Sequence, residues 1–243
     1  MKEVKQQDGG GTANNMIDED IDVWYKYPQY HNMCNKLWLS EKLGYKCGPA
    51  GIPVPKDDWY IIRPTYNLAG MGVGAKRVRL SPDDWDKGIV PAGYFWCEWF
   101  SGEHLSIDYV RRKESPKGSV FWWEFQRAYI GEKVPLRPFE FGSWKRTEIS
   151  KDPLILPDWF RFIEADALNV EMIDGNIIEI HLRQGFDHMD QYNVIYPVFE
   201  YNCMMSPTMG PATVLGKPGF KYIDGSATGY GALKNKRLGY WVK

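Results

Sequence analysis

An Asp-Gly pair between two alternating segments constrains the fold of this chain more than any other feature. Asp174 and Gly175 both tolerate the positive φ angles of a tight two-residue turn. Residues 166–173 before this pair and 176–182 after it alternate apolar with polar side chains, as strands do. The sequence therefore predicts an antiparallel hairpin, and the hairpin decides which side chains share a face.

Alternation assigns the side chains of the second strand to two faces. One face is expected to carry Ile178, Ile180 and Leu182. The other is expected to carry Ile177, Glu179, His181 and Arg183. Pairing is expected to bring Asp166 close to Glu179, and two carboxylates beside an imidazole and a guanidinium suit a hard cation that bridges an anionic ligand. For a hairpin taken alone, a solvated edge is the simpler interpretation.

Composition indicates an ordinary globular protein. The chain has 243 residues, of which 44% are hydrophobic, so it is long enough for one large domain or two small lobes. Its formal net charge of −1 provides no overall field for nucleic acid or an anionic membrane. No apolar stretch reaches the roughly 18 residues of a membrane span, and the start lacks a secretory signal, so we expect a cytoplasmic protein. The cysteines lack CxxC spacing and are expected to be free thiols in a reducing compartment; they are Cys34, Cys47, Cys97 and Cys203.

Residues 1–22 are polar and acidic, which predicts a mobile arm. The segment 30–43 has helical spacing and Gly44 follows it as a C-cap. Alternating or continuous apolar runs predict strands at 59–64, 73–80, 94–100, 104–111 and 120–130. Residues 135–149 are expected to be irregular, and 201–243 to form an irregular basic extension.

A glycine-rich turn follows the strand that ends at Arg63. Glycines recur at Gly70, Gly72 and Gly74, so the backbone amides of this turn can point toward phosphate oxygens. The turn is not a P-loop, because no Gly-Lys-Ser/Thr follows. We therefore expect a strand, a glycine-rich turn and a second strand, with a guanidinium at the root of the turn.

The order of these features resembles the ATP-grasp superfamily. Arg63 and the glycine-rich turn match its phosphate-binding hairpin, and the run from Glu98 to Glu103 matches its hinge. Asp166 and Glu179 match its acidic pair. The resemblance covers residues 30–190 and implies an α+β fold with two antiparallel-sheet lobes that hold ATP between them. Residues 23–110 would then form the first part of the domain, with the hairpin and hinge, and 111–200 the second, with the metal-binding hairpin.

The resemblance also implies roles for single residues. ATP would be bound by Lys36, Arg63, Gly70, Met71, Gly72, Gly74, Glu98, Trp99, Phe100, Glu103 and Ile178. Asp166, Glu179 and His181 would hold the metal. Arg183, Arg63 and Arg111 would stabilise the charge on the transferred phosphoryl group or the carboxylate. The implied reaction activates a carboxylate as an acyl phosphate for attack by an amine.

Three departures from the family pattern modify these expectations. His181 stands where the family has an amide ligand, and because imidazole suits Mg²⁺ poorly, Mn²⁺ is the alternative. Glu164 stands where some relatives carry arginine, so Arg183, or Arg111 and Arg112, would supply that charge. The lobe that usually precedes this domain is not found in the sequence, so the substrate site is expected to be built from the C-terminal part or from a partner protein that supplies the lobe.

Three other functions fit parts of the sequence. A catalytically inactive nucleotide-binding or scaffold protein fits the changes at Glu164 and His181. A nucleic-acid module fits the basic residues from Arg111 to Lys113 and the basic C-terminal stretch. A non-haem iron centre would use His181 with Asp187, His188 and Asp190.

Overall fold

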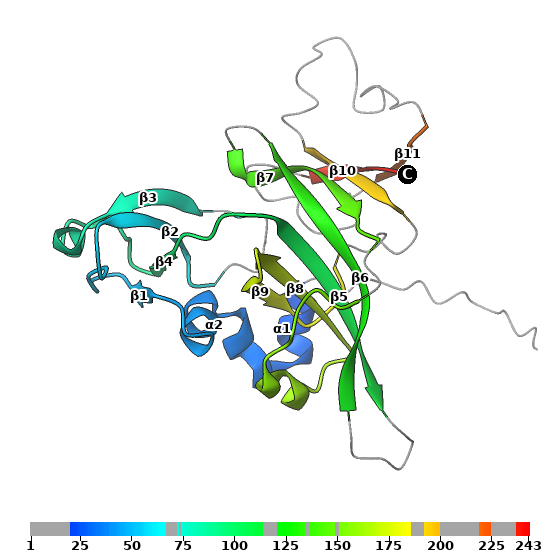
Figure 1. Cartoon of the computed structure of the whole chain (residues 1–243), viewed down its shortest axis with the longest axis horizontal. Coiled ribbons are helices and arrows are strands. Elements are labelled where there is room, and N and C mark those ends of the chain that lie inside the picture. The colour runs from blue at the N-terminus through cyan, green and yellow to red at the C-terminus, as the bar shows by residue number, and fades with distance from the viewer. Residues whose placement is uncertain are drawn as a thin grey trace, which may run out of the picture.

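The fold consists of two antiparallel sheets with short helices beside the larger one (Figure 1). The computed structural model describes residues 20–66, 72, 74–113, 121–134, 137–148, 151–185, 192–199, 219–224 and 237–243. Among these residues, no helix combines the length and the apolar character that a membrane crossing requires. The expected α+β architecture with two antiparallel-sheet lobes is confirmed.

Four strands form the smaller sheet in the order β1-β4-β2-β3. They are β1 (Cys47–Pro49), β2 (Asp58–Pro64), β3 (Lys76–Leu80) and β4 (Tyr94–Glu98). One face buries an apolar cluster around Tyr60, Ile62 and Trp96. The other face carries Arg63, because it alternates with Ile62 along β2.

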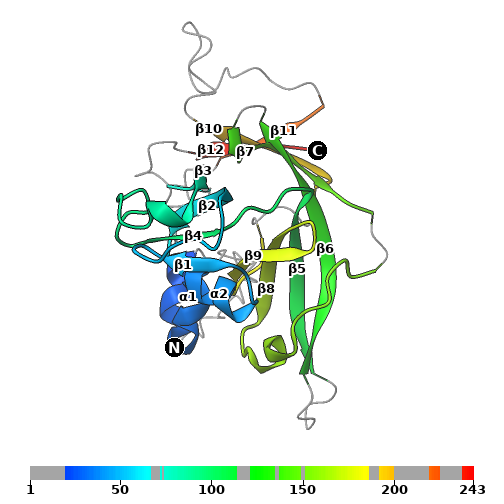
Figure 2. The same cartoon turned by 60° about the vertical axis from the view of Figure 1, so that its left-hand side comes forward.

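Eight strands form the larger sheet in the order β11-β12-β10-β7-β6-β5-β8-β9. They are β5 (His104–Lys113), β6 (Phe121–Val134), β7 (Arg137–Arg146), β8 (Ala167–Ile173), β9 (Asn176–His181), β10 (Val194–Phe199), β11 (Lys221–Asp224) and β12 (Arg237–Val242). The hairpin predicted around Asp174 and Gly175 is the pair β8 and β9, and Asp174 has the positive φ of 48° that its turn requires. β9 is an edge strand and lies between β8 and the smaller sheet (Figures 1 and 2).

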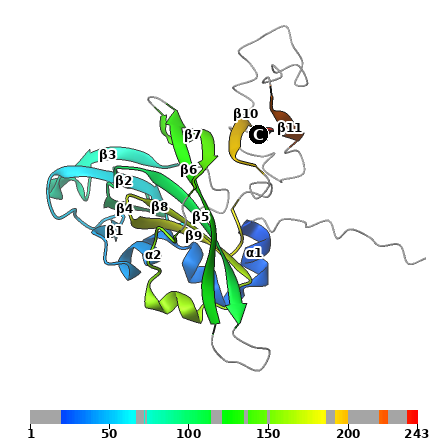
Figure 3. The ribbon, with the colours of Figure 1, turned by 45° about the vertical axis from the view of Figure 1, so that its right-hand side comes forward.

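Helices cover the β9 edge of the larger sheet (Figure 3). They are α1 (Asp20–Lys26), the 3-10 helix η1 (Pro28–Cys34) and α2 (Lys36–Lys42), and η3 (Asp158–Phe162) packs into the same core. A further 3-10 helix, η2 (Pro82–Asp84), follows β3. The helix predicted over 30–43 is divided at Asn35, whose side chain caps α2 by accepting from the Trp38 amide at 2.9 Å. The main core joins this helical layer to one face of β5, β8 and β9.

The structure corrects four predictions about segments. The predicted arm 1–22 overlaps α1, because Asp20 is buried by ion pairs; residues 1–19 lie outside the described part. Residues 137–146, expected to be irregular, form β7 because they pair with β6. The C-terminal extension supplies β11 and β12. The predicted boundary between the two parts of the domain, at residues 110 and 111, falls inside β5. The chain passes from the smaller to the larger sheet between Glu98 and His104.

Candidate functional site

A bulge in β9 determines which of its groups face the smaller sheet. Pairing aligns Glu171 with Glu179 and shifts register beside them, so Ile178 is the extra residue. The shift places Ile177 in the apolar core. The expectation that Ile177 shares a face with Glu179 is therefore wrong, because strict alternation fails at a bulge.

Arg63 reaches from β2 to this bulge. Its Nη2 donates to the carbonyl oxygen of Ile178 at 3.1 Å, and its guanidinium lies 5.3 Å from the ring centre of Phe95. The residue is 8% exposed, Nε has no hydrogen-bond partner, and no described carboxylate forms an ion pair with it. Burial lowers the pKa of Arg63, and the charge of Glu179 opposes that shift. A buried cation without a contacting anion is costly, so this position favours an anionic ligand.

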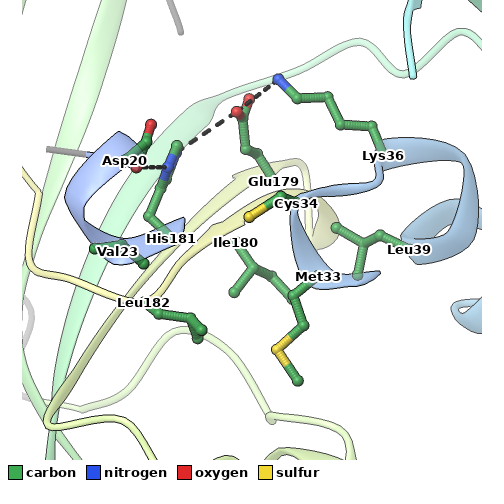
Figure 4. Close-up of a pocket in the computed structure, with 10 residues that line it drawn as sticks. All are labelled: Asp20, Val23, Met33, Cys34, Lys36, Leu39, Glu179, Ile180, His181 and Leu182. Atoms are coloured by element: carbon green, nitrogen blue, oxygen red, sulfur yellow. Dashed lines mark hydrogen bonds and ion pairs between the residues drawn. The ribbon is translucent and has the colours of Figure 1, made fainter. Parts of the chain in front are cut away.

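A chain of charged side chains crosses the β9 edge (Figure 4). Lys36 Nζ lies 2.6 Å from Glu179 Oε1, and His181 Nε2 lies 3.7 Å from the same oxygen. On its other side, His181 Nδ1 lies 2.9 Å from Asp20 Oδ1. Arg183 Nε donates to that Asp20 oxygen at 2.8 Å. Lys36 and Glu179 are thus paired with each other, whereas Arg183 and His181 are joined to a carboxylate from α1.

Burial and neighbouring charges shift the pKa values of Asp20 and His181 in opposite directions. Burial raises the pKa of Asp20, but the charges and hydrogen bonds of His181 and Arg183 outweigh it, and the pKa ends well below the usual range. Burial lowers the pKa of His181, and the Asp20 carboxylate outweighs that effect, so the pKa ends above its ordinary value. Asp20 therefore stays ionised, and the imidazolium form of His181 is favoured.

The sequence interpretation missed His104 and Glu171. His104 Nε2 lies 3.1 Å from Glu171 Oε2, and the buried Nδ1 of His104 has no hydrogen-bond partner. Burial raises the pKa of Glu171, but the hydrogen bond and charge of His104 turn the net shift downward. The sequence does contain a signal for both residues. His104 alternates with apolar residues in the strand predicted at 104–111, and the β8–β9 hairpin pairs Glu171 with Glu179.

A second buried polar group continues the same face of the sheet. Asp108, only 2% exposed, accepts from Arg127 Nε at 2.8 Å, from Asn169 Nδ2 at 2.8 Å and from the Gly185 amide at 2.6 Å. This carboxylate is fully occupied by protein donors. We therefore assign it to fixing β5, β6 and β8 beneath the site.

Asp166 does not reach the other predicted ligands. It precedes β8, its side chain is 87% exposed, and it contacts Tyr27 Oη at 3.1 Å and Lys26 Nζ at 3.5 Å. Five residues of strand, about 16 Å, separate it from Glu171, which faces Glu179. The expectation that Asp166 and Glu179 meet is wrong, because strand register rather than sequence spacing sets the partner.

The residues predicted to hold a metal ion do not fit one in the part of the chain that the structure describes. Glu179 is paired with Lys36 and His181 is bonded to Asp20. The described residues contain no group of three His, Cys, Asp or Glu side chains arranged to hold one. The alternative iron centre used Asp187, His188 and Asp190, which lie outside the described residues.

The predicted hinge residues lie between the two sheets. Glu98 Oε1 accepts from the Lys46 amide at 2.8 Å, which ties the hinge to β1. The guanidinium of Arg77 lies 4.9 Å from the ring centre of Trp99. Phe100 packs edge-on against Tyr45, with ring centres 4.8 Å apart.

The remaining predicted nucleotide contacts are Glu103, at the end of the hinge, and the residues of the glycine-rich turn. The Glu103 carbonyl accepts from the Asp174 amide at 2.9 Å, which joins the hinge to the β8–β9 turn. Gly72 and Gly74 have φ of 61° and 79°, and a Cβ at Gly74 would lie 2.8 Å from Tyr94 Oη. Glycine is therefore required there. Gly70 and Met71 lie outside the described residues.

Arg111 is the predicted catalytic residue that lies away from the site. Its guanidinium lies 3.8 Å from the ring centre of Phe121, and its position in β5 alternates with the polar face that carries Asp108. Arg112 next to it pairs with Glu124. The placement of Arg111 at the reacting groups is therefore wrong, because it occupies the far end and the opposite face of the strand.

Comparison with known proteins identifies the fold. No family model matches the sequence, and no curated protein matches it. A structure of N5-carboxyaminoimidazole synthetase from Staphylococcus aureus complexed with ADP is similar over 89% of this chain and 68% of its own, with a TM-score of 0.53 and 12% identity.

Two other solved structures are similar over less of their length. An L-amino acid ligase from Bacillus licheniformis matches 65% of this chain, with a TM-score of 0.42 and 13% identity. A putative ATP-grasp superfamily protein from Archaeoglobus fulgidus matches 70% of it, with a TM-score of 0.41 and 14% identity. The chain spans 42% and 58% of these two proteins, respectively. Its two antiparallel sheets and its overlap with the synthetase lead to one conclusion: the chain has the ATP-grasp fold.

Proposed function

We propose that this protein binds ATP between its two sheets and uses it to join a carboxylate to an amine. The observation that carries the nucleotide part is Arg63, a buried guanidinium whose hydrogen-bond partner is a carbonyl and which has no carboxylate partner among the described residues. A phosphate oxygen at Arg63 would compensate its charge and satisfy Nε. Lys36 also reaches the β9 edge, where it forms an ion pair with Glu179.

The position of the hinge supports an adenine site next to these cations. Trp99 and Phe100 follow β4 directly, and β4 pairs with β2, the strand that carries Arg63. A purine packed there would place its phosphates toward Arg63 and Lys36. The ADP bound by the similar synthetase is in keeping with such a site.

The proposed chemistry needs little covalent participation by the protein. The γ-phosphoryl group of ATP passes to the carboxylate oxygen and gives an acyl phosphate and ADP. The amine then attacks the acyl carbon, and phosphate leaves. Positioning and cationic charge lower the barrier of the first step, and Arg63 and Lys36 supply that charge.

A second candidate is nucleotide binding without turnover. One observation favours it: Arg183 and His181, which the ligase reaction would use on the carboxylate or phosphate, are occupied by Asp20. Because the cations and acids of the β9 edge neutralise one another, an anion has to displace a protein carboxylate to reach Arg183.

Hydroxylamine trapping distinguishes the two candidates. Hydroxylamine replaces the amine and converts any acyl phosphate to a hydroxamate, so a panel of carboxylic acids can be screened with ATP, Mg²⁺ or Mn²⁺. The ligase predicts ADP and hydroxamate in equal amounts, lost in Arg63→Gln and retained in Asp166→Asn. Binding of nucleotide with no hydroxamate from any acid supports the second candidate, and absence of nucleotide binding contradicts both.

A further inference from the structure

Two cysteines face each other across the smaller sheet. Cys47 in β1 is the register partner of Cys97 in β4, so their side chains project from the same face. The adjacent pair is hydrogen-bonded, because the Glu98 amide donates to the Lys46 carbonyl at 2.9 Å. Hydrogen-bonded and non-hydrogen-bonded pairs alternate along an antiparallel ladder, so Cys47 and Cys97 form a non-hydrogen-bonded pair.

This type of pair has the spacing that a disulfide needs. Opposite Cα atoms in a non-hydrogen-bonded pair lie about 4.5 Å apart, with their side chains closer than in the other kind of pair. Disulfides span Cα distances of roughly 4.4–6.8 Å. Both thiols are free in the structure. The register therefore places the two cysteines at the kind of strand pair whose spacing allows a disulfide.

The two thiols differ in solvent accessibility, which determines which of them reacts first. Cys47 is half-buried on a short edge strand, whereas Cys97 is 1% exposed. Burial raises the pKa of Cys47 to about 12, and the neighbouring Cys97 adds to this shift. Burial also raises the pKa of Cys97 to about 11, which Arg63 opposes. Few thiolates are present at neutral pH, so exchange is slow and starts at Cys47.

We propose that Cys47 and Cys97 form a reversible intrachain disulfide by exchange with a small-molecule disulfide such as glutathione disulfide. The Cys47 thiolate attacks one sulfur of glutathione disulfide, forms a mixed disulfide and releases one glutathione thiolate. The Cys97 thiolate then attacks the Cys47 sulfur and releases the second. Two protein thiols are oxidised and one glutathione disulfide is reduced to two glutathione molecules.

The bond would fix the edge strand β1 to the strand that leads into the hinge. Glu98 directly follows Cys97 and already accepts from the Lys46 amide, so the bond would reinforce an existing contact. Cys34 provides a matched control, because it is also half-buried with a pKa raised to about 11 but lies in η1 with no cysteine paired across a strand. This inference does not rest on the proposed function.

The test is oxidation of the intact folded protein followed by peptide mapping. The protein is incubated for hours at pH 9 with glutathione disulfide, quenched in acid, alkylated and digested without reductant. We expect a Cys47–Cys97 linked peptide that dithiothreitol removes, unchanged in Cys34→Ser. Cys97→Ser should stop at a glutathione adduct on Cys47.

Three results of the wild-type experiment would overturn the proposal, and none depends on a variant folding. They are complete alkylation of both cysteines after oxidation, stable glutathione adducts on both, or a link from either to a different cysteine. Detection of the Cys47–Cys97 peptide supports it.

Discussion

Arg63 and Arg183 both place a guanidinium group at β9, but the two groups have different partners. Arg63 donates to the Ile178 carbonyl and has no carboxylate partner among the described residues. Arg183 donates to Asp20, whose pKa is depressed by the contact. The fold compensates the charge of Arg183 internally, whereas no described carboxylate compensates that of Arg63 by direct contact. Residue type and strand position therefore do not distinguish the two arginines, whereas their contacts do.

The largest expected effect follows from removing the internal anion. Asp20→Ala leaves Arg183 and His181 buried without their carboxylate, and breaking a buried ion pair costs about 3–5 kcal/mol. Urea denaturation of wild type and variant measures the free energy of unfolding. A cost below about 1 kcal/mol would mean that α1 does not compensate these charges.

A smaller effect is expected when Lys36 loses its partner. Glu179→Gln should lower the free energy of unfolding by about 2 kcal/mol, since the ion pair is largely buried but remains partly accessible. The variant should bind ADP more tightly than wild type, because Lys36 no longer has to leave a carboxylate. Unfolding in urea with and without ADP checks both effects, and weaker ADP binding would show that Lys36 does not take part.

The pH dependence of stability tests the charge on His181. Its pKa is raised in the folded state above the ordinary 6.5, so protonation stabilises the fold below about pH 6.5 and this contribution is lost as pH rises through the folded pKa. The slope attributable to one such group is at most about 1.4 kcal/mol per pH unit. His181→Gln should flatten the profile across this window, and an unchanged slope would assign the titration to another group.

The smallest effect is expected at Asp166. Its carboxylate is exposed and lies away from the β9 edge, so Asp166→Ala should change the free energy of unfolding by less than about 0.5 kcal/mol. Nucleotide binding should also be unchanged. Loss of nucleotide binding in this variant would show that Asp166 belongs to the nucleotide site.

Much of the fold could be predicted from the sequence because local signals agreed. The Asp174–Gly175 turn, the β2 strand ending near Arg63 and the polar face of β5 all follow from alternation and turn chemistry. β7 was missed because glycine, proline and charged residues obscure its pattern, and pairing with β6 overrides them.

The site was predictable only in part, because it depends on register and on distant segments. The predicted hairpin and the family's acidic pair suggested that Asp166 meets Glu179, whereas the short turn and the bulge at Ile178 place Glu171 there. Asp20 lies in a polar segment with no local sign of burial. Its contact with Arg183 joins residues that no alternation pattern relates.

The most direct test of the central claim is calorimetric titration of ADP into wild type and Arg63→Gln, each with Mg²⁺. The account predicts saturable binding of one nucleotide by wild type and at least a hundredfold weaker binding by the variant, which should still unfold cooperatively. Equal binding by the two proteins would contradict the assignment of Arg63 as the phosphate-binding cation, and no binding by wild type would contradict the nucleotide site itself.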